Sequence, residues 1–219
     1  MNRRALPLAA TLVATAALLL TACGGDGTST GNDKVAGADT GNEISASPTA
    51  SAAASASGSG RPQIKLPSDL TYTFDWPKTG DTGRDAVLAD SEQSIKAVDL
   101  AITNQNPLDK AYLYYYEGEA AAGTEKFIQT YVDHKSGITG TYRFYSPVVV
   151  VDDDGTASLS YCEDQGKAFI KHLETNKIRK TKVTAKSYVA YNTSLKRDSK
   201  GVWVIEKMVS EVGSAKCQP

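Results

Sequence analysis

The period of the sequence changes in the stretch GITGTYRFYSPVVVV, residues 137–151. Before this stretch, hydrophobic residues recur at three- and four-residue spacings, as they do on one face of a helix. Within it, two sets of side chains alternate, Ile138, Gly140, Tyr142 and Phe144 against Thr139, Thr141, Arg143 and Tyr145. Alternation is the pattern of a β-strand. The chain therefore places helices first and strands afterwards, which is typical of an α+β protein.

Three helices are predicted before the change. The longest, Arg84–Gln105, carries hydrophobic residues at helical spacing and ends before Pro107, since proline cannot continue a helix. Two shorter helices are expected at Leu108–Glu117 and Glu119–Asp133. Residues 61–80, before the first helix, are expected to form an extended lead-in to the folded domain.

Several strands are predicted after it. A turn at Asp152–Gly155 separates the first from the next, and the later strands are expected at Ala157–Glu163, Gly166–Leu173, Lys177–Val183, Lys186–Arg197 and Val202–Val212. We expect them to form an antiparallel meander that curves strongly into a cone. The N-terminal helices would pack on this sheet, and the first would close its open face, giving one domain over residues 81–219.

The N-terminus has the pattern of a lipoprotein signal peptide over residues 1–22. Two arginines precede the apolar stretch Ala5–Leu20, which is too short to span a bilayer comfortably. The tetrapeptide Leu20-Thr21-Ala22-Cys23 resembles the bacterial lipobox, which implies a diacylglyceryl group on Cys23 and cleavage before it. We expect a palmitate-type acyl anchor on the extracytoplasmic face of the cell membrane. A plain signal peptide or an uncleaved anchor is the alternative.

Residues 23–60 have the composition of a disordered tether, because Gly, Ala, Ser and Thr dominate and aromatic residues are absent. From Arg61 onwards the chain has 21 basic and 21 acidic side chains. This balance argues against nucleic acid as a partner, since proteins that bind it are strongly basic. The expected partners are the membrane, through the anchor, and an unidentified small ligand or protein.

Two cysteines, Cys162 and Cys217, remain once Cys23 carries the lipid. An even pair in an oxidising compartment favours a disulfide between them. A free buried pair and a metal site are the alternatives, and the metal site lacks ligands because the chain has only two histidines. We expect no metal and no cofactor.

Motifs of known enzymes are scarce. The sequence has no Gly-x-Ser-x-Gly, no glycine-rich phosphate loop and no His-Glu-x-x-His. His134 and His172 are each expected to be surface side chains rather than catalytic bases. The basic run from Lys177 to Lys182 predicts a solvated edge strand, with contact to anionic headgroups or wall polymers as the alternative.

Five short segments carry a resemblance to a known family: Phe144-Tyr145-Ser146-Pro147, Tyr161-Cys162-Glu163-Asp164-Gln165, Ala168-Phe169, Gly201-Val202-Trp203 and the terminal Cys217. Over residues 82–219 the chain resembles actinobacterial secreted lipoproteins with an NTF2-like (SnoaL-like) domain. The resemblance implies a cone-shaped α+β fold, a disulfide and an outer-surface location. The family has no defined activity to carry over.

The 11 tyrosines, against 4 phenylalanines, favour a pocket for a partly polar ligand, because tyrosine offers apolar area and a hydroxyl. The residues expected to line it are Tyr112, Tyr116, Tyr142, Tyr145, Tyr161, Tyr188 and Trp203. The alternative is that most of them are core residues. Asp164 is a weak catalytic candidate, by analogy with related cone enzymes that use a carboxylate on a strand as general acid or base.

These patterns predict a lipid-anchored extracytoplasmic domain that binds a small ligand or a protein without catalysis. One alternative is a SnoaL-like enzyme that acts by acid–base chemistry on a small cyclic or polyketide-like molecule. The other is an accessory module of a cell-wall enzyme or transporter.

Overall fold

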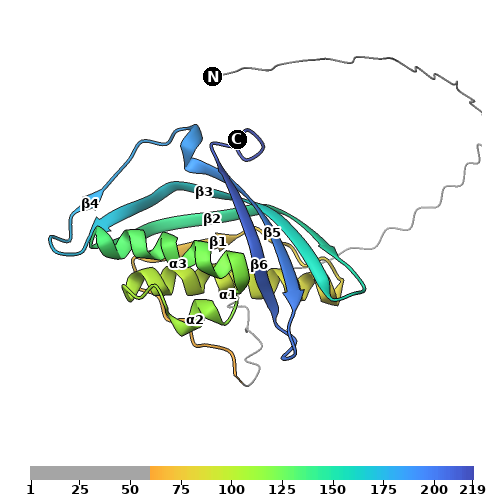
Figure 1. Ribbon diagram of the computed structural model, residues 1–219. Coiled ribbons are helices and arrows are strands. Elements are labelled where there is room, and N and C mark those ends of the chain that lie inside the picture. The colour runs from red at the N-terminus through yellow and green to blue at the C-terminus, as the bar shows by residue number, and fades with distance from the viewer. Residues whose placement is uncertain (1–59) are drawn as a thin grey trace, which may run out of the picture. The chain divides into compact units, whose positions relative to one another are not determined.

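The computed structural model describes residues 60–219, so the predicted signal peptide and nearly all of the tether, residues 1–59, lie outside the described part. Three helices lie against one face of a curved sheet (Figure 1). They are α1, Thr82–Thr103, the single-turn α2, Lys110–Leu113, and α3, Gly118–Asp133. Helix α1 starts where expected because the carboxylate of Asp81 accepts the backbone N–H of Arg84 at 2.9 Å.

The sheet has six strands, with the order β1-β2-β3-β5-β6 and β4 paired to β3. The strands are β1 Leu70–Phe74, β2 Ser136–Val151, β3 Thr156–His172, β4 Ile178–Arg179, β5 Tyr188–Arg197 and β6 Trp203–Val212. A short 3-10 helix, η1, occupies Ala185–Ser187. Every neighbouring pair is antiparallel except β1 and β2, which run parallel. The α+β class with helices packed on a curved sheet is confirmed.

Four details differ from the sequence-based predictions. The lead-in is not merely extended, because Leu70–Phe74 adds a parallel edge strand to β2. The predicted strands 157–163 and 166–173 are one strand, since a turn in which the Asp164 carboxylate accepts the N–H of Gly166 at 2.7 Å bends β3 without ending it. The predicted strand 177–183 pairs over two residues only. The second predicted helix shrinks to one turn.

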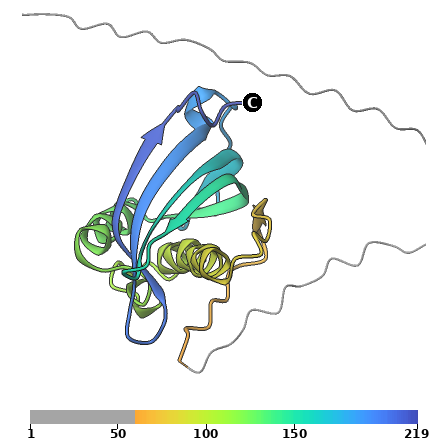
Figure 2. The same cartoon turned by 90° about the vertical axis from the view of Figure 1, so that its right-hand side faces the viewer.

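Curvature arises where β2 departs from regular pairing with β3. The register shifts between Thr141 and Arg143 and again between Tyr145 and Val148, and shifts of this kind bend a strand. Gly140 has a φ of +103°, and a Cβ there would lie 2.1 Å from the carbonyl oxygen of Lys167. Figure 2 shows the sheet curling around α1. The concave face therefore faces the helices, and the main core lies between them.

The two faces of the sheet differ in what they bury. The concave face contributes Leu159, Tyr161 and Phe144 to the main core with the helices. On the other side, a disulfide joins Cys162 to Cys217, whose Cα atoms are 5.4 Å apart. Tyr145 packs against this small second cluster. The expected disulfide is thus present and fixes the end of the chain to β3.

Candidate functional site

A pocket of about 300 Å³ opens between the concave face of the sheet and the segment that connects β4 to β5. We call residues 180–187 of this segment the strap, and the hollow the mouth pocket. Tyr131 of α3, Tyr142 of β2 and Gln165 of β3 form one wall. The strap supplies the opposite wall, and Ala168, Phe169 and Ile170 of β3 complete the lining. A volume of this size matches the smaller pockets that proteins use for small molecules.

Two carboxyl groups, the buried Glu163 and the half-buried Asp99, lie inside the cone near residues that line the mouth pocket. Asp99 of α1 accepts a hydrogen bond from the hydroxyl of Tyr72 at 2.6 Å. Glu163 of β3 accepts one from the amide of Gln165 at 3.0 Å and is also hydrogen-bonded to Tyr191. Gln165 therefore links Glu163 directly to the pocket wall.

Burial raises the pKa of both carboxyl groups. The pKa of Asp99 is raised to about 7 by loss of solvent and by the neighbouring charge of Glu163, against a lowering by the bond from Tyr72. The pKa of Glu163 is raised to about 7, first by loss of solvent, while its bonds to Tyr191 and Gln165 lower it. Each group therefore keeps its proton to a higher pH than an exposed carboxyl group does.

Tyrosine side chains surround the two acids. Burial raises the pKa of Tyr72, Tyr142 and Tyr191, and the pKa of Tyr131 is raised to about 12 by the same cause. All of them are therefore neutral at physiological pH and can donate hydrogen bonds. The rings of Tyr72 and Tyr142 stack with centroids 6.0 Å apart. The interior is thus rich in hydroxyl groups but carries no fixed positive charge among the residues named here.

The seven residues predicted to line a pocket fall into four places. Tyr142 lines the mouth pocket. Tyr161 lies on the concave face, stacked on Tyr191 at 5.0 Å. The core with the helices buries Tyr112, Tyr116 and Trp203. Tyr145 and Tyr188 pack beside the disulfide, away from the pocket, because their positions on β2 and β5 face the other side of the sheet. The structure therefore does not bring the seven together.

Asp164 and its neighbour Glu163 point to opposite faces of β3, as successive residues of a strand do. Asp164 is hydrogen-bonded to the backbone of Gly166 and its charge acts on Tyr145, which lies by the disulfide. Among the described residues it does not line the mouth pocket. Glu163 is the acid that faces the interior.

Glu163 and Asp99 were missed by the sequence-based reasoning, although both carried a signal. Glu163 is two residues beyond Tyr161 and therefore shares its face of the strand. Asp99 lies four residues after Ile95 and three before Ile102, which places it on the apolar face of the helix. Acids on apolar faces are unusual enough to mark a candidate site. Tyr131 and Gln165 carried no comparable signal, because they line a pocket only when the strap, a separate segment of the chain, packs against them.

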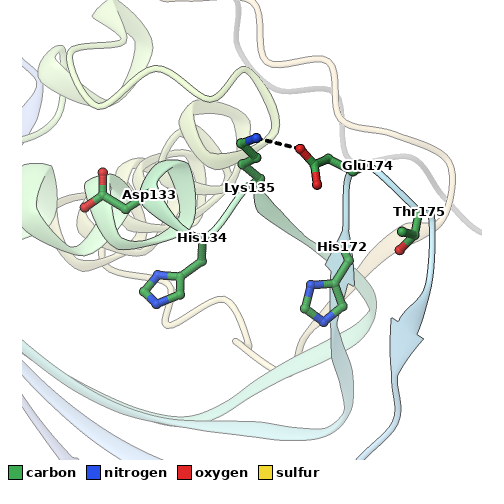
Figure 3. A pocket seen from close by; sticks show the side chains of 6 residues that line it. All are labelled: Asp133, His134, Lys135, His172, Glu174 and Thr175. Carbon is green, nitrogen blue, oxygen red and sulfur yellow. Dashed lines mark hydrogen bonds and ion pairs between the residues drawn. The ribbon is translucent and has the colours of Figure 1, made fainter.

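A second hollow, of about 320 Å³, lies where α3 ends and β2 begins. Figure 3 shows His134 and His172 on one side of it and the ion pair of Lys135 with Glu174, 2.5 Å between charged atoms, on the other. Both histidines are exposed, as expected. His134 donates its Nδ1–H to the carbonyl of Thr130 at 2.7 Å. The two hollows are about equally open to solvent, but all six residues that line this one are exposed, whereas Tyr131, Tyr142 and Gln165 of the mouth pocket are half-buried.

Acidic, histidine and cysteine side chains are spread over residues 60–219. Among them there is no group of three or more His, Cys, Asp or Glu side chains placed to hold a metal ion. No helix of this part of the chain has both the length and the apolar character needed to cross a membrane.

The fold and the mouth pocket together define a small α+β domain with a ligand-sized hollow at the open end of its curved sheet. No protein family model and no curated protein matches the chain. Among solved structures it is similar to a ketosteroid isomerase-like protein from Erwinia carotovora atroseptica, at 12% identity and a TM-score of 0.39, covering 61% of this chain and 98% of that one.

Two further solved structures are similar at the same level. ActVI-ORFA from Streptomyces coelicolor matches at 11% identity and a TM-score of 0.40, over 60% of this chain and 96% of that chain. A putative aromatic ring hydroxylase from Novosphingobium aromaticivorans matches at 14% identity and a TM-score of 0.40, over 59% and 87%. Similarities this low concern the path of the chain and not its chemistry.

Proposed function

We propose that the protein is a lipid-anchored extracytoplasmic domain that binds a small ligand in the mouth pocket and does not transform it. The observation that carries the proposal is the pocket itself, which has tyrosine and amide groups on one wall and hydroxyl groups of the strap on the other. Among the described residues, the carboxyl groups suited to acid–base chemistry do not line it. Asp99 and Glu163 are engaged by Tyr72 and Gln165 instead.

The ligand site is tested with the neutral fluorescent probe N-phenyl-1-naphthylamine. We expect saturable one-to-one binding to the full chain, carried with Cys23→Ser so that no acyl chain competes for the probe. Ala168→Trp should abolish the binding, because Ala168 lines the pocket and a large ring would fill it. Lys167→Trp, one residue earlier and exposed, is the matched control and should leave the binding intact. Equal binding by both variants would contradict the proposal.

The membrane anchor rests on the sequence around Cys23, which lies outside the described residues. The disulfide supports an extracytoplasmic location, because such bonds persist mainly in oxidising compartments. Cys23→Ala should release the protein from membranes into the medium when both fractions are probed by immunoblot. Retention of the variant on membranes would refute lipidation.

A second candidate function is acid–base catalysis on a small cyclic molecule, and the raised pKa values of Asp99 and Glu163 favour it. It requires Glu163 to contact the ligand, which a rotation of Gln165 would permit. Carboxyl carbon NMR with labelled glutamate distinguishes the two functions. A probe-induced shift of the Glu163 resonance that matches direct contact would favour the enzyme, whereas a Glu163 signal unchanged at saturation would favour binding alone.

A further inference from the structure

The charges around the mouth pocket are unbalanced. Five basic residues lie between positions 177 and 186, and no acidic residue occurs from 175 to 197. The ion pairs formed among the described residues involve Arg61, Lys96, Lys135, Arg143 and Lys171, so none involves these five. The basic run is therefore not explained by internal salt bridges.

Two of the five, Lys182 and Lys186, line the mouth pocket, and the strap places them opposite Tyr131 and Tyr142. The strap also brings the hydroxyls of Thr181, Thr184 and Ser187 to the same wall. A capping box between Thr184 and Ser187 holds the last turn of the strap in place. The pocket thus has one aromatic wall and one wall of cationic and hydroxyl groups.

None of the acids near the mouth pocket forms an ion pair with Lys182 or Lys186. Asp99 and Glu163 lie behind the opposite wall and are hydrogen-bonded there. Glu174 is paired with Lys135 at the other hollow. Asp164 accepts the N–H of Gly166 on the other face of the sheet. Lys182 and Lys186 thus form no ion pair among the described residues, and their ammonium groups are available to an anionic group inside the pocket.

We propose that the ligand of the mouth pocket is an anionic amphiphile, with a flat apolar ring system against Tyr131 and Tyr142 and a carboxylate, sulfonate or phosphate group held by Lys182 and Lys186. The proposal rests on the proposed binding function and adds the chemical class of the ligand. Lysine provides a point charge for such groups, and the hydroxyls of the strap add hydrogen-bond donors.

The test uses two probes that differ only by a sulfonate. 1-Anilinonaphthalene-8-sulfonate carries it, and N-phenyl-1-naphthylamine does not. We expect the full chain with Cys23→Ser to bind both, and the double variant Lys182→Gln, Lys186→Gln to raise the Kd of the sulfonate about tenfold while leaving the neutral probe unchanged. The control, Lys177→Gln with Lys180→Gln, removes the same charge outside the lining and should change neither Kd.

The outcomes separate the two proposals. Equal loss of sulfonate binding in both double variants, or no loss in either, would overturn the ligand class while the binding function stands. Failure of both probes to bind the parent chain would overturn the binding function itself.

Vesicles of phosphatidylglycerol and of phosphatidylcholine identify the source of the anion. If the parent floats with the anionic vesicles and the double variant Lys182→Gln, Lys186→Gln does not, the anionic group belongs to a lipid headgroup. If the parent does not float, the anionic group belongs to a soluble molecule.

Discussion

Glu163→Gln should make the protein more stable at pH 8 and leave its stability at pH 4.5 almost unchanged. Glu163 is only 6% exposed, and burial raises its pKa from an ordinary 4.5 to about 7. Each pKa unit corresponds to about 1.36 kcal/mol, so ionisation of this group in the folded protein costs about 3 kcal/mol. Glutamine has the same shape, stays neutral at every pH and can still accept the bond from Gln165.

The sign follows from proton binding in the two states. Below about pH 4.5, Glu163 is protonated in both the folded and the unfolded chain, and the folded state keeps its full stability. As the pH rises to about 7, the unfolded chain loses the proton first, so the free energy of unfolding falls. Above this pH both states are ionised and the loss is complete. Asp99, with its pKa raised to about 7, contributes in the same direction.

The assay is urea unfolding at pH 4.5, 6 and 8 without reductant, followed by the fluorescence of the two tryptophans. The ring of Trp76 packs 5.5 Å from that of Tyr161, and Trp203 is buried in the core. The parent should lose stability from pH 4.5 to 8, and Glu163→Gln should lose about 3 kcal/mol less. Glu125→Gln, at an exposed position of α3, is the control and should follow the parent. If the free energy of unfolding of Glu163→Gln changes with pH as that of the parent does, or is lower than the parent's at pH 8, the pKa of Glu163 is not raised by burial.

Replacement of both Cys162 and Cys217 by Ala opens a loop of 55 residues and should lower the free energy of unfolding by about 4 kcal/mol; an unchanged urea midpoint would contradict this. Gly140→Ala should cost about 2 kcal/mol or more, because its Cβ would meet the backbone of β3 at a strained φ. Gly123→Ala in α3 has nothing within 4 Å and should instead add about 0.5–1 kcal/mol. Equal thermal midpoints for the two glycine variants would argue against the close approach of β2 and β3.

Local patterns predicted most elements of the fold. The change of period at Gly137 is real, and the spacing of Leu88, Ile95 and Ile102 located α1 to within two residues. The parallel strand Leu70–Phe74 was missed because its partner, β2, begins more than 60 residues later, and a single short strand shows no sign of which neighbour it joins. The sequence predicted two strands where β3 is continuous, because the turn at Asp164 has the local pattern of a strand end.

The candidate site was predicted less well. Tyrosine content indicated a polar aromatic interior, and Tyr142 does line the mouth pocket. Tyr145 and Tyr188 were assigned to the same pocket although alternation along a strand sends them to the other face of the sheet. Asp164 was preferred over Glu163, and one residue on a strand decides between the two faces.

The sequence by itself determined the helix-then-strand order, which depends on near neighbours, and the even number of cysteines left for a disulfide. Hydrophobic periodicity and turn residues act over a few positions, so the sequence alone predicts the helices and strands that they specify. Only the tertiary structure decided which groups meet. It placed Asp99 of α1 and Glu163 of β3 in one interior, and it brought the strap lysines and Tyr142 to one pocket, because irregular pairing between β2 and β3 curves the sheet and brings distant segments together. The raised pKa of each carboxyl is a consequence of that enclosure.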